Sequence, residues 1–477
     1  MRQDTFAGRS PATLLLLMLL YVTAHVVSRV LISDALELDE AEQALWTQQF
    51  AAGYGAQPPL YTWLQWAVFK VAGVSVLSLS LLKNALLALT YTFVWLAARR
   101  IMAAPLAVLA AASMLLLPQI GWESQRDLTH SVLVTTLASA TLYVVVCLIE
   151  RPRPALYVAL GIAAGLGVMS KYSYIVFFTA LGLAVLTTRE TRAVWRNPWV
   201  LASGLIAAVI VLPHLLWLLD NWQLASARTM EKLDATHGFG QGIARGLGSL
   251  ANAFAATLAA PALVFGIVFG RAAWRRDDGS PHCAFWRRYL LALLTIMLAM
   301  IVLAGATHFK GRWLQPLLFA APLMFFCCRP GLANHPRLHW LRRVLFVLAL
   351  LFLTLLSLRP AFNGWRDNMD QLNEPAAELA AALTAAGYDG HAAIVTDDPV
   401  LGGVLRVRFP QAQVSLWRDG QHAPEAIQGP HLLVGKDAAG AALFQRAGSI
   451  AATPLALHYR YARPDHPAIE YRYALPH

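Results

Sequence analysis

The sequence has 477 residues, of which 57% are hydrophobic and only 14% are charged. This composition excludes a water-soluble globular protein and indicates an integral membrane protein. Arginines that flank predicted membrane spans account for much of the net charge of +11, so the charge does not call for a nucleic-acid partner.

A helix needs roughly 20 apolar residues to cross the hydrocarbon core of a bilayer. No small-residue cleavage site follows Ile32, so the first apolar segment is predicted to be an uncleaved span. We predict a mainly α-helical polytopic membrane protein with about eleven spans. They lie near residues 12–32, 76–98, 103–118, 129–149, 154–169, 172–188, 199–219, 247–270, 288–305, 313–328 and 340–358.

Basic residues predict the orientation of these spans. Pairs such as Arg99–Arg100, Arg275–Arg276 and Arg342–Arg343 fall on one side, and the opposite side carries far fewer basic residues. The positive-inside rule then places the N-terminus in the cytoplasm. Residues 1–358 form the predicted membrane domain. Residues 359–477 form a predicted domain on the outer side of the membrane.

The first outer segment, residues 33–75, contains an acidic pair, Asp39–Glu40. The pattern in DEAEQALWTQQFAAG predicts an amphipathic helix on the membrane, with this pair in its first turn. There the carboxylates either cap the helix or form part of a site. Gln57, Pro58, Pro59 and Tyr61 follow at the start of a second predicted helix, PLYTWLQWAVFKVAG, and are predicted to line a substrate pocket.

Each cation on the outer side needs a reason, because a charge at the mouth of a span is unfavourable unless it is paired or hydrated. The side chains either snorkel to the headgroups or converge on an anion such as a lipid phosphate. We favour the anion site, whose predicted residues are Arg126, Lys171, Lys310 and Arg312. Asp127, His214 and His308 are further candidates for the substrate pocket. The histidine spacing predicts no metal site, although a divalent metal stays open as a cofactor.

The cysteines and the C-terminal segment complete the pattern. Cys147, Cys283, Cys327 and Cys328 all fall outside the outer segments, so no disulfide framework is predicted. In the last segment, EPAAELAAALTAAGY reads as a helix ended by Gly387, and HAAIVTD, VSLW and HLLVGKD read as strands. A small α/β domain is therefore expected.

The order of four motifs resembles that of the GT-C membrane glycosyltransferases. The motifs are Asp39–Glu40 after the first span, Pro58-Pro59-Leu60, GLGVMSK ending at Lys171, and KGRWLQPL beginning at Lys310. The resemblance covers about residues 10–330. It is strongest to the group of protein O-mannosyltransferases and lipid A aminoarabinose transferases, and within it to bacterial enzymes that add sugars such as galacturonic acid to lipopolysaccharide.

The resemblance implies a polyprenyl-phosphate-linked sugar as donor and transfer at the periplasmic face. It implies that Asp39 is the general base, that Glu40 supports or orients it, and that Lys171 binds the phosphate. It also makes Asp127 an acid of the same region. The chain departs from the aminoarabinose transferases at Gln57, where they carry Lys, and at Glu42–Gln43, where they tend to carry Arg-Tyr, so aminoarabinose itself is not expected.

The residues are consistent with an inverting transfer, because one base and one activated leaving group suffice for a single displacement. The expected acceptor is a hydroxyl of lipid A, the lipopolysaccharide core, another envelope glycan or a protein. A flippase for a lipid-linked sugar is the main alternative, and a non-enzymatic scaffold is a third. Neither the sugar nor the acceptor follows from the sequence.

Overall fold

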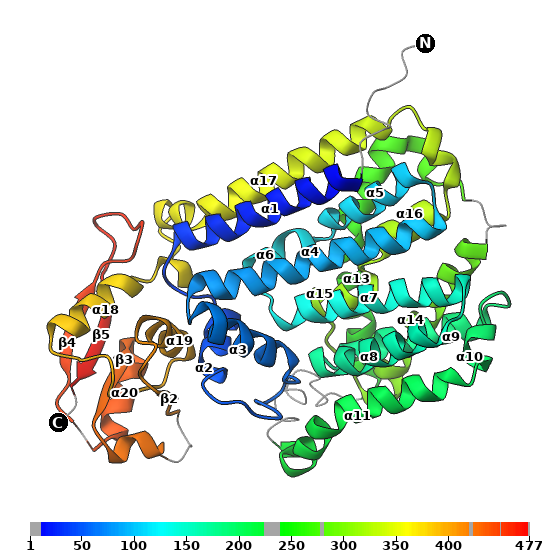
Figure 1. The fold of residues 1–477 in the computed structure, drawn as a ribbon. Coiled ribbons are helices and arrows are strands. Elements are labelled where there is room, and N and C mark those ends of the chain that lie inside the picture. The colour runs from blue at the N-terminus through cyan, green and yellow to red at the C-terminus, as the bar shows by residue number, and fades with distance from the viewer. Residues whose placement is uncertain (1–10, 224–238, 277–280, 419–422, 449, 476–477) are drawn as a thin grey trace. The chain divides into compact units, whose positions relative to one another are not determined.

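The computed structural model describes residues 11–223, 239–276, 281–418, 423–448 and 450–475 (Figure 1). The chain divides into two compact units. The first unit comprises Met1–Val22, Ala51–Tyr61 and Ala85–Phe352, and the second comprises Thr23–Phe50, Thr62–Asn84 and Leu353–His477. The division falls inside four helices, so neither unit is a continuous stretch of sequence.

Six helices in the described residues are long and apolar enough to cross a membrane. They are α4 (Val76–Ile101), α7 (His130–Glu150), α11 (Trp199–Asp220), α13 (Phe239–Phe269), α14 (Pro281–Ala304) and α17 (Leu338–Trp365). These helices make the chain an integral membrane protein. The remaining predicted spans also correspond to helices, but shorter or broken ones, so the number eleven stays a prediction.

The third predicted span is bent by 74° between Ala104–Leu116 and Gln119–Arg126. It consists of α5 (Ala104–Ala112), η1 (Ser113–Leu116), η2 (Gln119–Glu123) and α6 (Ser124–Arg126). Leu117 is extended and Pro118 follows it. The residue before a proline is disfavoured in the helical region, which explains why the helix stops there.

Four predicted spans are short. They are α1 (Pro11–Ile32, which counts here over Leu16–Ile32), α8 (Pro154–Ser170) and α9 (Ser173–Thr187). The fourth is the tenth predicted span, which is divided between α15 (Gly311–Leu318) and α16 (Ala321–Cys327). Gly161 and Gly165 of α8 face α11, where an added Cβ would lie 2.6 Å from the Ser203 carbonyl oxygen and 2.8 Å from Ile210 Cβ. Small residues four apart let two helix backbones approach closely, as is common between membrane helices.

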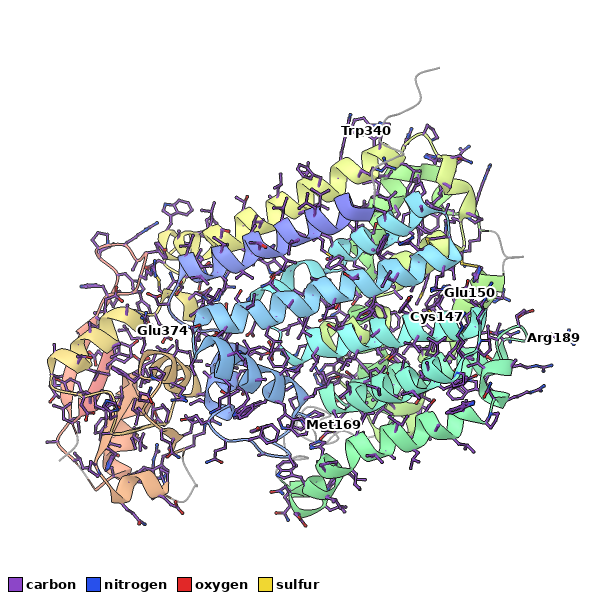
Figure 2. The ribbon with its side chains drawn as sticks, viewed as in Figure 1. Cys147, Glu150, Met169, Arg189, Trp340 and Glu374 are labelled. Carbon is purple, nitrogen blue, oxygen red and sulfur yellow. A yellow bond between two sulfur atoms is a disulfide. The ribbon has the colours of Figure 1, made fainter. Side chains whose placement is uncertain are left out.

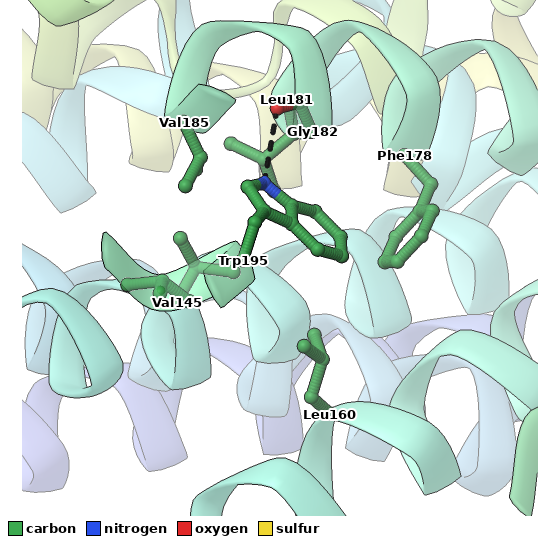
Figure 3. Close-up of a pocket in the computed structure, with 8 residues that line it drawn as sticks. Val145, Leu160, Phe178, Leu181, Gly182, Val185 and Trp195 are labelled. Atoms are coloured by element: carbon green, nitrogen blue, oxygen red, sulfur yellow. Dashed lines mark hydrogen bonds between the residues drawn. The ribbon is translucent and has the colours of Figure 1, made fainter. Parts of the chain in front are cut away.

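The two ends of this bundle differ in charge. Figure 2 shows Glu150 and Arg189 at one end of the first unit and Met169, next to the end of α8, at the other. Glu150 pairs with Arg100. The segment 189–196 contains three arginines and ends with α10 (Ala193–Arg196), which is fixed where the Trp195 indole donates to the Gly182 carbonyl oxygen at 3.2 Å (Figure 3). Lys171 therefore follows the helix end opposite to this Arg-rich end.

Cys283 and Cys328 form a disulfide, with their Cα atoms 4.9 Å apart. The expectation of no disulfide is therefore wrong. The start of α14 and the end of α16 come together in the first unit, and the sequence separation of 45 residues gives no sign of this contact.

The second unit contains α2 (Leu38–Trp46), most of α3 (Leu60–Ala72) and a mixed sheet. Its strands are β1 (Ala393–Thr396), β2 (Val414–Leu416), β3 (His431–Lys436), β4 (Thr453–Leu457) and β5 (Ile469–Ala474), in the order β2-β1-β3-β5-β4. β1 pairs in parallel with β2 and β3, and β5 pairs antiparallel with β3 and β4. The three predicted strands are confirmed, and β4 and β5 are additional.

Helices α18 (Ala376–Ala385), α19 (Pro399–Arg408) and α20 (Asp437–Arg446) surround this sheet (Figure 1). We call residues 371–475 the C-terminal module. Gly387, at φ +106°, follows α18 as predicted. Glu374 (labelled in Figure 2) is buried and pairs with Lys436 Nζ at 2.6 Å. The prediction that residues 359–477 form a separate periplasmic domain stays a prediction.

Candidate functional site

Glu40 lies in the first turn of α2 and is buried, with 1% of its surface exposed. Its carboxylate accepts hydrogen bonds from Arg29 Nη2 at 2.5 Å and from the Glu37 backbone N–H at 3.1 Å, and it lies 3.6 Å from Lys83 Nζ. Burial raises the pKa of Glu40, but these two cations and the hydrogen bonds outweigh it and hold the pKa at about 2. Glu40 is thus a charged anchor for the helix.

Glu37 precedes α2 and is held by a second set of charges. It pairs with Arg359, whose Nη2 lies 2.8 Å from Asp370 Oδ2. Burial is the main influence on the Glu37 carboxyl and raises its pKa, although Arg359 opposes this. Both carboxylates that flank position 39 are therefore engaged in ion pairs inside the second unit.

Asp39 lies between these two anchors in sequence and is only half-buried. Consecutive helical residues point about 100° apart, so the side chain of Asp39 leaves α2 in a different direction from that of Glu40. Of the two carboxylates in the acidic pair, Asp39 is the one that retains access to solvent. Glu40 is the second member of a capping box with Glu37, and the catalytic role of Asp39 stays a prediction.

Lys171 follows α8 directly, in extended conformation, and its Nζ donates to Ser131 Oγ at 2.7 Å. Ser131 lies in the first turn of α7, the end at which a helix carries partial positive charge. An ammonium group beside a helix N-terminus is a favourable environment for an anion. Ser131 was not predicted as a site residue, because a serine in an apolar span is not a distinctive signal.

The Pro58–Pro59 segment belongs to the first unit and is fixed at both ends. At one end, the buried Tyr61 ring contacts the His130 ring at 5.5 Å between centroids, and His130 Nδ1 lies 3.4 Å from the Ser170 carbonyl oxygen. Both prolines are buried, and Gln57 is half-buried. Tyr61 is thereby tied to the residue that immediately precedes Lys171.

His214 of α11 fixes the other end. Its Nδ1 lies 2.7 Å from the Ala52 carbonyl oxygen and its Nε2 lies 2.9 Å from Tyr172 Oη. A neutral ring that donates from Nδ1 and accepts at Nε2 satisfies both contacts. Both ring nitrogens therefore bond within the protein. Through them, His214 links the segment before Gln57 to the turn that follows Lys171.

The other predicted residues of the first unit lie on or next to two neighbouring elements, α6 and α15. Gln315 of α15 donates to Ser124 Oγ at 2.9 Å, and Ser124 donates to the Gln119 carbonyl oxygen at 2.7 Å. Arg126 of α6 is exposed and Arg312 of α15 is half-buried, whereas the other predicted residues lie just outside these helices: Asp127 after α6 is half-buried, and Lys310 and His308 before α15 are exposed. Asp39 and Glu40 belong to the second unit.

Three cations of the second unit were not predicted as site residues: Arg29, Lys83 and Arg359. Lys83 and Arg29 are buried in or near apolar spans, which is the signal by which functional charges in membranes are recognised.

An apolar pocket near Trp195 is not a candidate for a sugar. Figure 3 shows that aliphatic and aromatic side chains such as Val145, Leu160 and Phe178 line it.

Comparison with known families and sequences gives three consistent relationships. Residues 56–217 match the family described as dolichyl-phosphate-mannose-protein mannosyltransferase. The lipopolysaccharide core galacturonosyltransferase RgtB of Rhizobium johnstonii is 36% identical over 403 residues, which cover 82% of this chain and 80% of the relative. RgtA of the same organism, another lipopolysaccharide core galacturonosyltransferase, is 34% identical over 447 residues, covering 91% of this chain and 89% of the relative.

Among solved structures, ArnT from Cupriavidus metallidurans in the apo state is similar over 97% of this chain and 98% of ArnT, with a TM-score of 0.60 and 16% identity. The form bound to undecaprenyl phosphate gives a TM-score of 0.57 and 15% identity. At this identity the likeness concerns the fold.

Proposed function

Because the chain belongs to the GT-C membrane glycosyltransferases, in the group of the bacterial lipopolysaccharide galacturonosyltransferases, we propose that it transfers galacturonic acid from a polyprenyl phosphate to an envelope glycolipid. The observation that carries the proposal is the 36% identity to a core galacturonosyltransferase over 82% of the chain. Gln57, in place of the lysine of aminoarabinose transferases, supports a different donor sugar. The acceptor is a hydroxyl of the lipopolysaccharide core or of lipid A.

In the proposed reaction Asp39 removes the proton of the acceptor hydroxyl. The hydroxyl oxygen forms a bond to the anomeric carbon while the bond from that carbon to the phosphate oxygen breaks, and the lipid phosphate departs with the electron pair. A single displacement of this kind inverts the anomeric centre. General base action contributes roughly 10²–10⁴-fold to the rate.

Lys171 and the N-terminus of α7 stabilise the negative charge that develops on the departing phosphate. Arg126, Lys310 and Arg312 are the other proposed cations for this phosphate. Gln57, Pro58, Pro59, Tyr61, Asp127, His214 and His308 are the proposed surroundings of the substrate, with His214 acting through Ala52 and Tyr172. The proposed location is the inner membrane, with the N-terminus in the cytoplasm and the C-terminal module in the periplasm.

The test is transfer by the full-length protein in liposomes that contain undecaprenyl-phosphate-linked galacturonic acid and lipopolysaccharide. Mass spectrometry of the acceptor should show one added uronic acid residue, and Asp39→Asn should slow the addition by roughly 10²–10⁴-fold, leaving only a residual rate. Glu378→Gln, which alters an exposed carboxylate of α18, serves as the control and should transfer normally. Donor that crosses the bilayer while the acceptor stays unmodified would instead establish the flippase.

A further inference from the structure

The helix that carries Asp39 is packed into the C-terminal module. Gly403 of α19 lies against Ala41 of α2, so that a Cβ added to Gly403 would be 2.4 Å from both Cα and Cβ of Ala41. Leu45, one turn further along α2, belongs to the same hydrophobic core as Leu401 and Leu405 of α19. Two residues after Asp39, α2 therefore meets α19 in a close backbone approach that only glycine permits.

Hydrogen bonds join both ends of this region of the chain to the module. Before α2, Ser33 Oγ donates to the Leu372 carbonyl oxygen at 2.6 Å, and the Leu38 N–H donates to Gln371 Oε1 at 3.0 Å. After α2, the Gln48 amide donates to the Val414 carbonyl oxygen at 2.9 Å and accepts from the Val414 N–H at 2.8 Å. Gln48 thus occupies the edge of β2 as a neighbouring strand residue would.

Charges add a third kind of contact. Asp34 pairs with Arg408 at 2.9 Å and lies 3.8 Å from Arg460. Asp370, which precedes the first turn of the module, holds Arg359 against Glu37. Exposed pairs are weak one by one, but here the partners come from several elements that surround one short helix.

A helix of nine residues has little stability of its own, because nucleation is unfavourable and few turns follow it. Its position must come from tertiary contacts, and the contacts above belong largely to the module. Through them, we propose that the C-terminal module acts as the positioning scaffold of the catalytic base, with Gly403 as its main positioning residue. This inference rests on the proposed function, since it assigns a task only if Asp39 is the base.

The experiment compares Gly403→Ala with Gly429→Ala, whose added Cβ would meet nothing within 4 Å. Alanine is favoured over glycine inside a helix, so Gly403→Ala acts through the clash with Ala41 rather than through the local backbone. A displacement of about 1 Å can lower a rate roughly 100-fold. We expect Gly403→Ala to lower kcat by about that factor, with the donor KM within about twofold of wild type, and Gly429→Ala to leave both unchanged.

A double-mutant cycle separates positioning from a general defect. If Gly403 acts through Asp39, adding Gly403→Ala to Asp39→Asn should cause no further loss of the residual single-turnover rate. Wild-type kcat in Gly403→Ala, a loss that persists undiminished in the Asp39→Asn background, or a change confined to donor KM would each overturn the inference.

Gln48→Ala provides a milder second variant, because it removes the two hydrogen bonds to Val414 without adding any atom. It decides the question if Gly403→Ala does not fold, and it should lower kcat selectively; an unchanged kcat would then overturn the scaffold. Failure of the proposed function has a different signature. In that case wild type transfers no sugar, or Asp39→Asn transfers as well as wild type.

Discussion

Glu40 illustrates how much a single buried charge depends on its partners. Replacing Glu40 by glutamine leaves Arg29 and Lys83 without this carboxylate, which should lower the stability at neutral pH by roughly 3–5 kcal/mol. The pKa of Glu40 is lowered from 4.5 to about 2, so the stabilisation is complete above pH 4.5 and is lost as the pH falls toward 2.

Thermal midpoints of wild type and Glu40→Gln in detergent, measured from pH 7 downwards, test this. The difference between the two proteins should be constant near neutral pH and should shrink below pH 4.5. Glu378→Gln, at an exposed site, should match wild type throughout. A Glu40→Gln protein as stable as wild type at pH 7 would show that the ion pairs do not hold α2.

Lys171 offers a prediction about binding. Lys171→Ala removes a charged donor from the N-terminus of α7 and should raise the donor KM by about 10- to 100-fold, since a hydrogen bond to a charged group contributes roughly 1.5–3 kcal/mol. Ser131→Ala should have a smaller effect, because Ser131 only orients the ammonium group.

Inhibition by undecaprenyl phosphate provides the measurement for Lys171→Ala, and its inhibition constant should rise by the same factor as the donor KM. Equal inhibition of wild type and Lys171→Ala would remove Lys171 from the phosphate site.

At the scale of elements, the Pro58–Pro59 segment depends on α11. Gly53 lies so close to Trp217 that an added Cβ would be 2.3 Å from the indole ring, and Trp217 stacks on His214 at 5.7 Å. Gly53→Ala should therefore displace Trp217 and His214, and it should lower the rate of sugar transfer by about tenfold or more while the protein stays folded. The control is Gly204→Ala on α11, whose added Cβ would meet nothing within 4 Å, and it should leave the rate of transfer unchanged. Normal transfer by Gly53→Ala would show that the segment tolerates displacement.

The elements also show what a sequence can predict. Long apolar stretches predicted the positions of the helices, because burial in lipid demands continuous hydrogen-bonded helix. The amphipathic helix expected from Asp39 to Gly53 ends earlier, at Trp46, because tertiary contacts such as that of Gln48 with Val414 replace helical ones. Strand β4 was missed because it contains Pro454, which is unfavourable inside a strand except at an edge, and β5 because it alternates buried and exposed residues instead of forming an apolar run like those of β1 and β3.

The acidic pair Asp39–Glu40 was identified from its position, but its division into an anchor and a half-exposed carboxylate depends on Arg29 and Lys83, which approach from other helices. Similarly, the sequence predicted His214 as a pocket residue. Its hydrogen bonds to Ala52 and Tyr172, which hold two segments of the first unit together, became visible only in the structure. Spacing along the chain carries no information about such partners.

For the whole molecule, the predicted orientation can be tested by labelling single cysteines in intact cells with a membrane-impermeant maleimide. Glu378→Cys, in the C-terminal module, should react from outside the inner membrane once the outer membrane is permeable. Arg189→Cys, at the Arg-rich end shown in Figure 2, should react only after the inner membrane is opened. The reverse pattern would invert the topology and with it the proposed periplasmic reaction.

The contact between Gly403 and Ala41 has a consequence for exchanging parts between relatives. A chimera that receives only the C-terminal portion of another galacturonosyltransferase would join a foreign α19 to a resident α2, and the two surfaces would no longer match. Residues 33–50 and 371–475 should instead be transplanted as one unit, although more than 300 residues separate them in the gene product. Hybrids built this way should retain activity where hybrids cut at a single junction lose it.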